Sequence, residues 1–136
     1  MSTVSPLYLL DTNICIYIIN RRPLKVFEHF VGKPYGQVAI SSITGAELSF
    51  GVAKSGSARN QQALDKFLAP LEILPFDGAA MHRYGELRAD LERTGRPIGA
   101  LDTLIAAHAL ALGATLVTNN IREFERVPAL PLENWA

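Results

Sequence analysis

The stretch LYLLDTNI, residues 7–14, places a carboxylate directly after a short apolar run near the start of the chain. The run at 7–10 is typical of a buried strand, and the apolar residues after Asp11 predict a helix over 12–20. Asp is a favoured N-cap residue, so capping that helix is an ordinary explanation for Asp11. In an open parallel sheet, however, ligand sites lie beyond the carboxyl ends of the strands. Asp11 is therefore also a candidate for such a site.

The composition is that of one globular domain, which we expect to span residues 1–136. Hydrophobic residues make up 49% of the chain and charged residues 19%, enough for a real core. The 13 basic and 13 acidic side chains balance, so a nucleic-acid partner requires a local basic patch. Cys15 is the only cysteine, which excludes an intrachain disulfide. Without a signal-peptide pattern or a bilayer-length apolar run, we expect a cytoplasmic protein with no membrane partner.

Short apolar runs and longer helical segments alternate along the chain. The short runs predict strands at 7–10, 37–41, 71–76, 115–118 and 130–133. The longer segments predict helices at 12–20, within 21–32, and at 44–55, 58–69, 79–94, 101–112 and 121–125. Strands that are continuously apolar are covered on both faces, so the pattern predicts an α/β fold with a mainly parallel sheet.

Polar residues follow three of the predicted strands or open a helix beside them. They are Asp11, then Ser41, Ser42, Thr44 and Glu47, then Thr118, Asn119 and Asn120, and finally Asp102. Each has a structural explanation: Thr44 and Glu47 fit a capping box. Asp102 complements a helix dipole, and Asn119–Asn120 is a common turn pair. None of these explanations accounts for the collection of polar residues at one edge of the sheet.

Carboxylates that meet at one sheet edge repel one another and raise one another's pKa. A divalent cation removes the repulsion, and oxygen ligands suit Mg²⁺ or Mn²⁺ rather than zinc. The histidines His29, His82 and His108 show no zinc spacing, and His108 is expected to be a core residue. The sequence contains no phosphate-binding glycine loop or nucleophile elbow. The acids therefore indicate metal-dependent chemistry.

Four motifs in order resemble those of PIN-domain proteins of the VapC type, the ribonuclease toxins of bacterial toxin–antitoxin pairs. They are LLDTNI, ISSITGAEL, IGALDTLIAAHAL and LVTNNIREF, and the similarity runs from about Leu7 to Trp135. The resemblance implies a doubly wound PIN-domain sheet of about five strands with order 3-2-1-4-5. It also implies a Mg²⁺- or Mn²⁺-dependent endoribonuclease that leaves a 3′-hydroxyl and a 5′-phosphate.

The resemblance further implies roles for individual residues. Asp11, Glu47 and Asp102 are the implied catalytic acids; Asp11 and Asp102 are direct metal ligands, and Glu47 is a ligand or holds metal-bound water. The implied supporting or substrate-contacting groups are Thr12, Asn13, Thr118, Asn119 and Asn120. Proteins of this kind often carry a fourth acid where this chain has Asn120. This departure predicts one negative charge fewer, and a second metal site completed by the RNA phosphate.

Partners follow from local charge and from the resemblance. The cations expected to hold RNA phosphates are Arg21, Arg22, Lys25, Arg122 and Arg126, unless they belong to a solvated face. The resemblance implies a tRNA substrate, with the initiator tRNA anticodon stem-loop as one target, a homodimer, and a VapB-type antitoxin that mediates any contact with DNA. The expected antitoxin groove lies between the 12–20 and 44–69 helices, with Ile14, Ile18, Leu48, Phe50 and Phe67 as possible contacts. For each of these residues a place in the core is the more common alternative.

Two other functions are compatible with the acids. An aspartyl phosphatase uses a nucleophile after the first strand, but it usually has a second acid where this chain has Asn13. A PIN-like module without catalysis would act only by binding. Chelator-sensitive RNA cleavage distinguishes a nuclease from the silent module, and phosphate release from small phosphoesters identifies a phosphatase.

Overall fold

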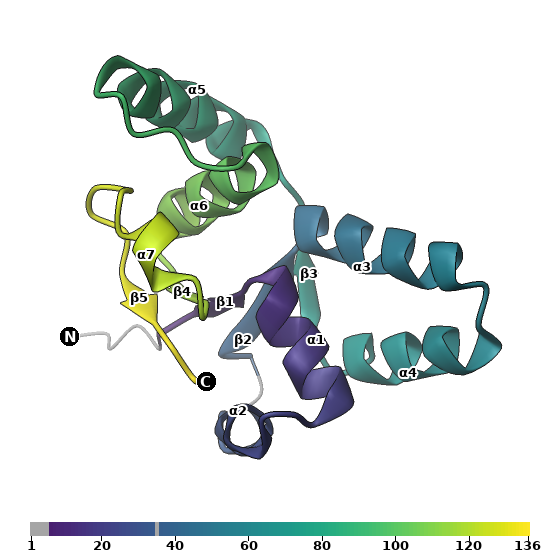
Figure 1. The fold of residues 1–136 in the computed structure, drawn as a ribbon. Coiled ribbons are helices and arrows are strands. Elements are labelled where there is room, and N and C mark those ends of the chain that lie inside the picture. The colour runs from purple at the N-terminus through teal and green to yellow at the C-terminus, as the bar shows by residue number, and fades with distance from the viewer. Residues whose placement is uncertain (1–5, 35) are drawn as a thin grey trace.

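A five-stranded parallel sheet with order β3-β2-β1-β4-β5 forms the centre of the protein (Figure 1). The structure is a computed structural model that describes residues 6–34 and 36–136. The strands are β1 (Tyr8–Leu10), β2 (Val38–Ser41), β3 (Glu72–Leu74), β4 (Thr115–Val117) and β5 (Leu132–Glu133). The predicted α/β class and strand order are confirmed.

Helices connect the strands and cover both faces of the sheet (Figure 1). They are α1 (Thr12–Asn20), α2 (Leu24–Val31), α3 (Ser42–Ser55), α4 (Ala58–Leu68), α5 (Gly78–Arg93), α6 (Ala100–Leu112) and α7 (Ile121–Phe124). None of the helices within 6–34 and 36–136 has the length and apolar character needed to cross a bilayer.

Successive residues of the central strands face opposite sides of the sheet, as the period of a strand requires. Leu9 and Leu116 lie in one core with residues of α5, α6 and α7. Their neighbours Leu10 and Val117 lie in a second core with residues of α1, α2, α3 and α4, closed by Trp135. Both faces of β1 and β4 are thus buried, which explains why these strands are continuously apolar.

The expectation that every strand is covered on both faces is wrong for β3. Glu72 and Ile73 of this strand are exposed, and the strand is shorter than the predicted range 71–76. The reason is its place at the edge of the sheet, where one side has no neighbouring strand. A short edge strand that carries a charge resists pairing with other chains.

Helix α3 begins two residues before its predicted start, and the expected capping box is wrong. Ser41, the last residue of β2, is the N-cap, and its Oγ accepts a hydrogen bond from the Ile43 amide at 3.1 Å. Thr44 therefore lies inside the helix, fully buried, and its hydroxyl has no partner among the described residues. Glu47 is free of a capping role, and its carboxylate turns to another helix.

His108 is a core histidine, as predicted. It is 1% exposed, its Nδ1 lies 2.8 Å from Ser41 Oγ, and Phe76 packs edge-on against its ring. Since Ser41 Oγ already accepts from Ile43, its proton is available to His108 Nδ1. Burial lowers the pKa of His108, an effect that the charge of Asp77 opposes. The imidazole is accordingly neutral in the folded protein.

The buried neutral state of His108 predicts acid-sensitive stability. Because its pKa is lower in the folded than in the unfolded chain, its contribution is present above pH 6.5 and is lost as pH falls through the folded pKa. As pH falls, we expect His108 to lower the free energy of unfolding by at most about 1.4 kcal/mol per pH unit. Urea unfolding at pH 7.5, 6.5 and 5.5 should show a shallower pH dependence for His108→Gln. Equal slopes in variant and wild type contradict this prediction.

Candidate active site

Asp11 stands at the end of β1, where the chain enters α1. Its backbone N–H donates to Val117 O at 3.0 Å, which ties the ends of β1 and β4 together. Its Oδ1 accepts from the Ile14 amide at 2.9 Å, so the expected N-cap role is confirmed. The side chain is 5% exposed, and burial raises the pKa of Asp11. Hydrogen bonds from Thr118 and Ile14 lower that pKa, whereas the charge of Glu47 raises it.

Glu47 faces α1 from the second turn of α3. Its Oε1 accepts a hydrogen bond from Thr12 Oγ1 at 2.7 Å. This bond joins α1 and α3 through two residues that are 35 positions apart in sequence. Its charge raises the pKa of both Asp11 and Asp102. The fold therefore brings the three predicted acids into one electrostatic group, and Thr12 orients one of them.

Asp102, in the first turn of α6, is paired with a fourth acid, Glu123 of α7. The pKa of Asp102 is raised to about 7, and burial is the largest cause. Its hydrogen bond with Glu123 and the negative charges of the other three acids raise this pKa further. The amide of Gly99 donates to Glu123 Oε1 at 2.8 Å and, as the largest effect, lowers the pKa of Glu123. Of the two carboxyls, Asp102 is therefore the one that binds a proton more readily.

A fourth acid is nevertheless present, because Glu123 lies beside Asp102 although the position of Asn120 itself carries no charge. Asn120 takes a supporting place instead, and its Nδ2 donates to Glu123 Oε2 at 2.6 Å. Asn120 directly follows the predicted strand, whereas the fourth acid lies one helical turn later, in α7. The sequence did contain one indication: Asn120 and Glu123 are spaced i,i+3 at the start of α7, and residues with this spacing are neighbours on a helix.

The other predicted polar residues divide into two groups. Thr118 reaches Asp11, and its Oγ1 accepts from the Asn120 amide at 2.9 Å, so it belongs to the site. Asn119 Nδ2 donates to Tyr17 Oη at 2.8 Å on the side of α1, and Asn13 is exposed. Their contact with substrate stays a prediction.

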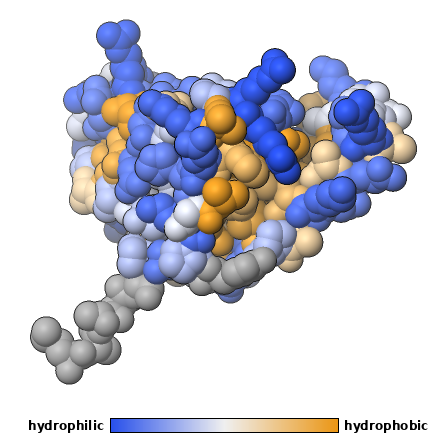
Figure 2. All heavy atoms as spheres, turned by 90° about the horizontal axis from the view of Figure 1, so that it is seen from below, coloured by the Kyte–Doolittle hydropathy of each residue, from blue (hydrophilic) through white to orange (hydrophobic). Residues whose placement is uncertain are grey.

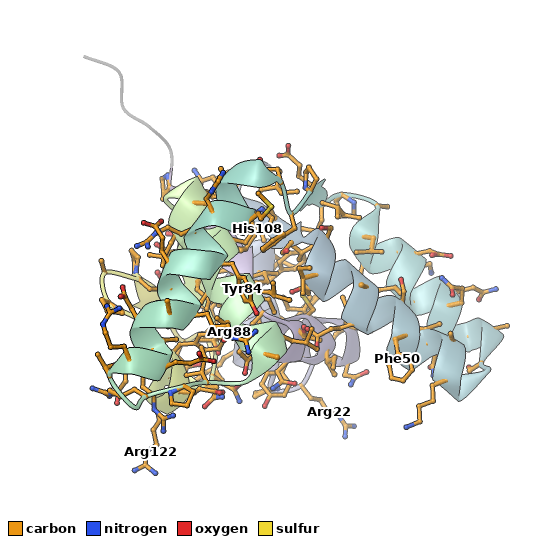
Figure 3. All side chains as sticks on the ribbon, turned by 90° about the horizontal axis from the view of Figure 1, so that it is seen from above. Arg22, Phe50, Tyr84, Arg88, His108 and Arg122 are labelled. Carbon is orange, nitrogen blue, oxygen red and sulfur yellow. The ribbon has the colours of Figure 1, made fainter. Side chains whose placement is uncertain are left out.

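The predicted RNA-binding cations do not gather at the acids. Arg21 lies 4.6 Å from the centroid of the Phe27 ring, and Lys25 lines a hollow on α2 with His29. Arg22 and Arg122 point outward at the periphery (Figure 3). A role for any of these in RNA binding stays a prediction.

Arg126 is the predicted cation whose charge acts on one of the acids. Its guanidinium donates to Pro97 O at 3.0 Å, and its charge helps to lower the pKa of Glu123.

The donor set suits a hard divalent cation rather than zinc, because the four acids present only oxygen. The Gly99 backbone lies beside both carboxyls: a Cβ built there would be in ordinary contact with Asp102 Oδ2 at 3.4 Å and with Glu123 Oε1 at 3.7 Å. Within residues 6–34 and 36–136, no three His, Cys, Asp or Glu side chains converge tightly enough to hold one ion. Asp102 Oδ2 and Glu123 Oε1 nevertheless both lie beside the Gly99 backbone, so the residues fit such an ion once the side chains of Asp11 and Glu47 adjust.

A groove between α1, α3 and α4 opens beside Glu47. Its volume is about 710 Å³, and it is lined by Thr12, Ile16, Ile19, Asn20, Glu47, Leu48, Gly51, Val52, Arg59, Asn60, Ala63 and Leu64. The groove lies where it was predicted, and for three of the five possible contacts the alternative of a place in the core is the one observed. Ile14, Ile18 and Phe67 face the core, because the helix period turns Ile16 and Ile19 toward the groove instead. Leu48 does line it, whereas Phe50 is 68% exposed and outside the lining (Figure 3).

Known proteins match this chain over nearly its whole length. The family model of the PIN domain matches residues 8–130. Ribonuclease VapC2 of Rickettsia felis is 51% identical, with 95% of this chain and 98% of that protein covered. The tRNA(fMet)-specific endonuclease VapC of Shigella flexneri is 44% identical, with 95% and 98% covered.

Solved structures agree with these relatives. VapBC2 of Rickettsia felis, bound to a DNA fragment from its promoter, superposes with a TM-score of 0.85 at 48% identity, with 96% of this chain and 99% of that chain covered. DNA-bound VapBC of Salmonella typhimurium superposes with a TM-score of 0.89 at 40% identity and the same coverage. The chain therefore belongs to the PIN domain family and, within it, to the VapC ribonucleases.

Proposed function

We propose that residues 1–136 form a single PIN domain that cleaves RNA with a divalent cation and acts as the toxin of a type II toxin–antitoxin pair. The observation that carries this proposal is the group of four carboxylates at the carboxyl edge of the sheet. The Thr12 hydroxyl holds Glu47 there, and the Gly99 amide holds Glu123. Relatives named as VapC ribonucleases support RNA as the substrate.

The residues of the chain prepare the site for Mg²⁺ or Mn²⁺. Asp11 and Asp102 hold the ion, and Glu47 ligates it or holds water, oriented by the Thr12 hydroxyl. The bond between Gly99 N and Glu123 fixes the carboxylate beside Asp102. When bound, the ion supplies an activated nucleophile and neutralises charge on the phosphate.

The proton on Asp102 predicts a steep acid limb for the metal requirement. A cation must displace this proton, and the proton is bound more tightly as pH falls below about 7. The Mg²⁺ concentration that gives half-maximal RNA cleavage should rise roughly tenfold per pH unit below 7. Titrations of Mg²⁺ at pH 8, 7 and 6 measure this. A Mg²⁺ requirement that is the same at pH 6 and pH 8 contradicts the prediction.

The proposed partner is a VapB-type antitoxin that occupies the groove beside Glu47. Support comes from the apolar floor of the groove, formed in part by Ile16, Ile19 and Leu48, and from its opening onto an active-site acid. Neighbouring structures named as VapBC complexes on DNA support contact with DNA through the antitoxin.

We also propose a homodimer. Exposed apolar side chains remain outside the groove, among them Leu24 and Val31 on α2, which are 59% and 60% exposed. Figure 2, seen from below, shows apolar surface bordered by hydrophilic side chains. Light scattering of the purified chain measures the stoichiometry.

The proposed substrate is tRNA, with the anticodon stem-loop of initiator tRNA as the specific target. The name of the Shigella flexneri relative, tRNA(fMet)-specific endonuclease, supports this. The test is to map 5′ ends of cellular RNA after brief expression, with Asp102→Ala as the control. We expect discrete new 5′-phosphate ends in one or few tRNAs that are missing with Asp102→Ala. An absence of discrete ends with the wild type contradicts the proposed function, and ends outside tRNA contradict only the substrate.

A further inference from the structure

A small pocket lies between α5 and the segment that leads into α6. Its volume is about 110 Å³, and it is lined by Tyr84, Arg88, Leu91, Glu92, Pro97, Ile98, Ala100 and Thr103. The segment that forms one wall also contacts the acids, because the amide of Gly99 donates to Glu123. Thr103 Oγ1 donates to Gly99 O at 2.8 Å and fixes the same segment from the pocket side. The pocket is therefore separated from the acids by the first turn of α6.

An aromatic ring and a guanidinium meet at this pocket. Tyr84 and Arg88 are at i and i+4 on α5, and Arg88 Nη1 donates to Tyr84 Oη at 2.9 Å. Arg88 Nε also donates to Glu92 Oε1 at 3.1 Å, so two contacts hold the guanidinium in place. Tyr84 is half-buried and Arg88 is exposed. In Figure 3 both project from the side of α5 that faces α1 and α3.

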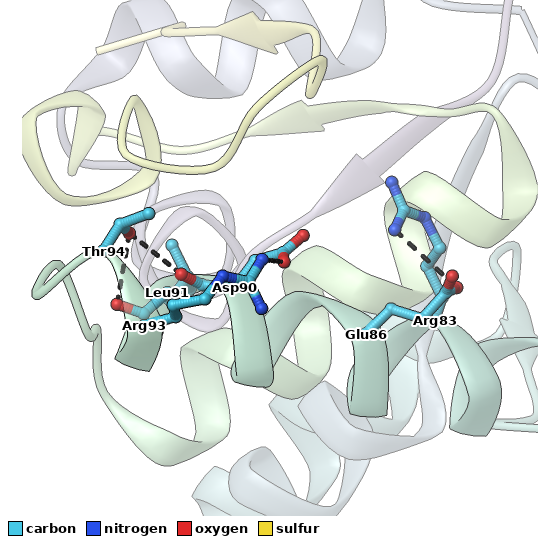
Figure 4. A network of polar contacts seen from close by, with 6 residues as sticks. All are labelled: Arg83, Glu86, Asp90, Leu91, Arg93 and Thr94. Atoms are coloured by element: carbon cyan, nitrogen blue, oxygen red, sulfur yellow. Dashed lines mark hydrogen bonds and ion pairs between the residues drawn. The ribbon is translucent and has the colours of Figure 1, made fainter.

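The other arginine pairs of α5 differ from this one. Arg83 is paired with Glu86 at 3.9 Å, and Arg93 with Asp90, next to the Thr94 hydroxyl (Figure 4). Each of these arginines meets one carboxylate, as Arg88 meets Glu92, but neither belongs to the lining of the pocket. Pairing on a solvated helix face explains Arg83 and Arg93 in full. For Arg88 it explains the contact with Glu92, whereas the bond to Tyr84 at the mouth of a pocket is an additional feature.

We propose that this pocket binds one unstacked nucleobase of the RNA strand, close to the phosphate that the acids cleave. The inference rests on the proposed ribonuclease function. Aromatic rings and guanidinium planes are the surfaces on which proteins stack single-stranded bases. With those bonds in place, Arg88 Nη2 can still donate and Glu92 Oε2 can still accept, so an acceptor and a donor of one base can be hydrogen-bonded there. A volume of about 110 Å³ suits one ring system and is below the range of pockets for larger ligands.

The pocket would bind the RNA strand on one side of the phosphodiester bond that is cleaved. A base held there fixes the strand beside the first turn of α6, where Asp102 lies. Tyr84 and Arg88 are thus substrate-positioning residues with a base-dependent effect.

The test compares cleavage by variants on RNA with and without the base. The probe is the RNA fragment cut by the wild type in the end-mapping experiment, made also with a single abasic nucleotide at each position beside the cut. We expect Tyr84→Leu to lower kcat/KM on intact RNA roughly ten- to hundredfold, and Arg88→Gln to lower it about tenfold. Tyr84→Phe keeps the ring and stays within about threefold. Arg93→Gln, on the same helix, is the matched control and leaves kcat/KM unchanged.

The abasic RNA separates base stacking from a structural effect. At one position the abasic substitution should lower cleavage by the wild type and remove the difference between the wild type and Tyr84→Leu. Tyr84→Leu alters a half-buried side chain and could lower the melting temperature. Because Arg88 is exposed, Arg88→Gln should stay folded and tests the same pocket in that case.

Three results overturn the base-binding role. The first is unchanged kcat/KM for both Tyr84→Leu and Arg88→Gln. The second is a loss of kcat/KM in Tyr84→Leu, relative to the wild type, that has the same size on every abasic RNA as on intact RNA. The third is unchanged cleavage with weakened binding of the antitoxin, which assigns the pocket to a protein partner. A wild type that cuts no RNA overturns the proposed function as well, whereas a cutting wild type with unaffected variants overturns only the base pocket.

Discussion

Asp11→Asn is expected to lower the rate of RNA cleavage about a thousandfold while the protein stays folded. Loss of a charged metal ligand removes several kcal/mol of transition-state stabilisation, and about 4 kcal/mol corresponds to that factor. Asn is also a favoured N-cap, so the bond from the Ile14 amide is retained. The change also removes a carboxylate whose pKa is raised by burial, so stability should be kept or increased.

Cleavage rates and melting temperatures of Asp11→Asn and the wild type test this separation of activity from stability. Asp65→Asn is the matched control, because Asp65 is an exposed acid on α4 whose Oδ1 accepts a bond from Gln61. Full activity in Asp11→Asn, or equal losses in both variants, contradicts the role of Asp11.

Glu123→Gln is expected to lower cleavage about a hundredfold, the upper end for a group that supports a metal ligand. Gln can still accept from the Gly99 amide, but it lacks the negative charge that holds the proton on Asp102. The pKa of Asp102 should fall as a result, and the acid limb of the pH–rate profile should move to lower pH. Glu125→Gln, which changes an exposed acid just after α7, is the matched control.

A purely structural role for Glu123 predicts a different outcome. Lower activity with an unshifted acid limb and a lower melting temperature would show that Glu123 stabilises α7 without acting on Asp102. Unchanged activity would show that three acids suffice.

The fold could be predicted because its sequence pattern is local and repetitive. Strands such as β1 and β4 are buried on both faces, so their apolar runs identify a parallel sheet. Helix α1 was predicted at its observed bounds, because Asp11 caps one end and the apolar period continues to Asn20. β3 was misjudged because the position of a strand within the sheet depends on tertiary packing, which the strand's own residues do not encode.

The site was predicted in part for a similar reason. Asp11, Glu47 and Asp102 follow strand ends or open helices, and their grouping follows from the topology. Glu123 was missed because its approach to Asp102 depends on the path of the Gly99 segment and on α7, which are separated by 24 residues. The Thr44 capping box failed because Ser41 already caps α3, a competition that local spacing does not resolve.

Cleavage of one defined RNA by metal-stripped protein, before and after Mg²⁺ or Mn²⁺ is restored, tests most directly whether the four carboxylates work through a cation. The wild type and Asp65→Asn should be inactive in chelator and should recover full cleavage with either metal. Asp11→Asn should remain inactive at the same metal concentrations. Cleavage by metal-stripped wild type at the undiminished rate, or recovery of Asp11→Asn to the wild-type rate, would contradict a metal site built on Asp11.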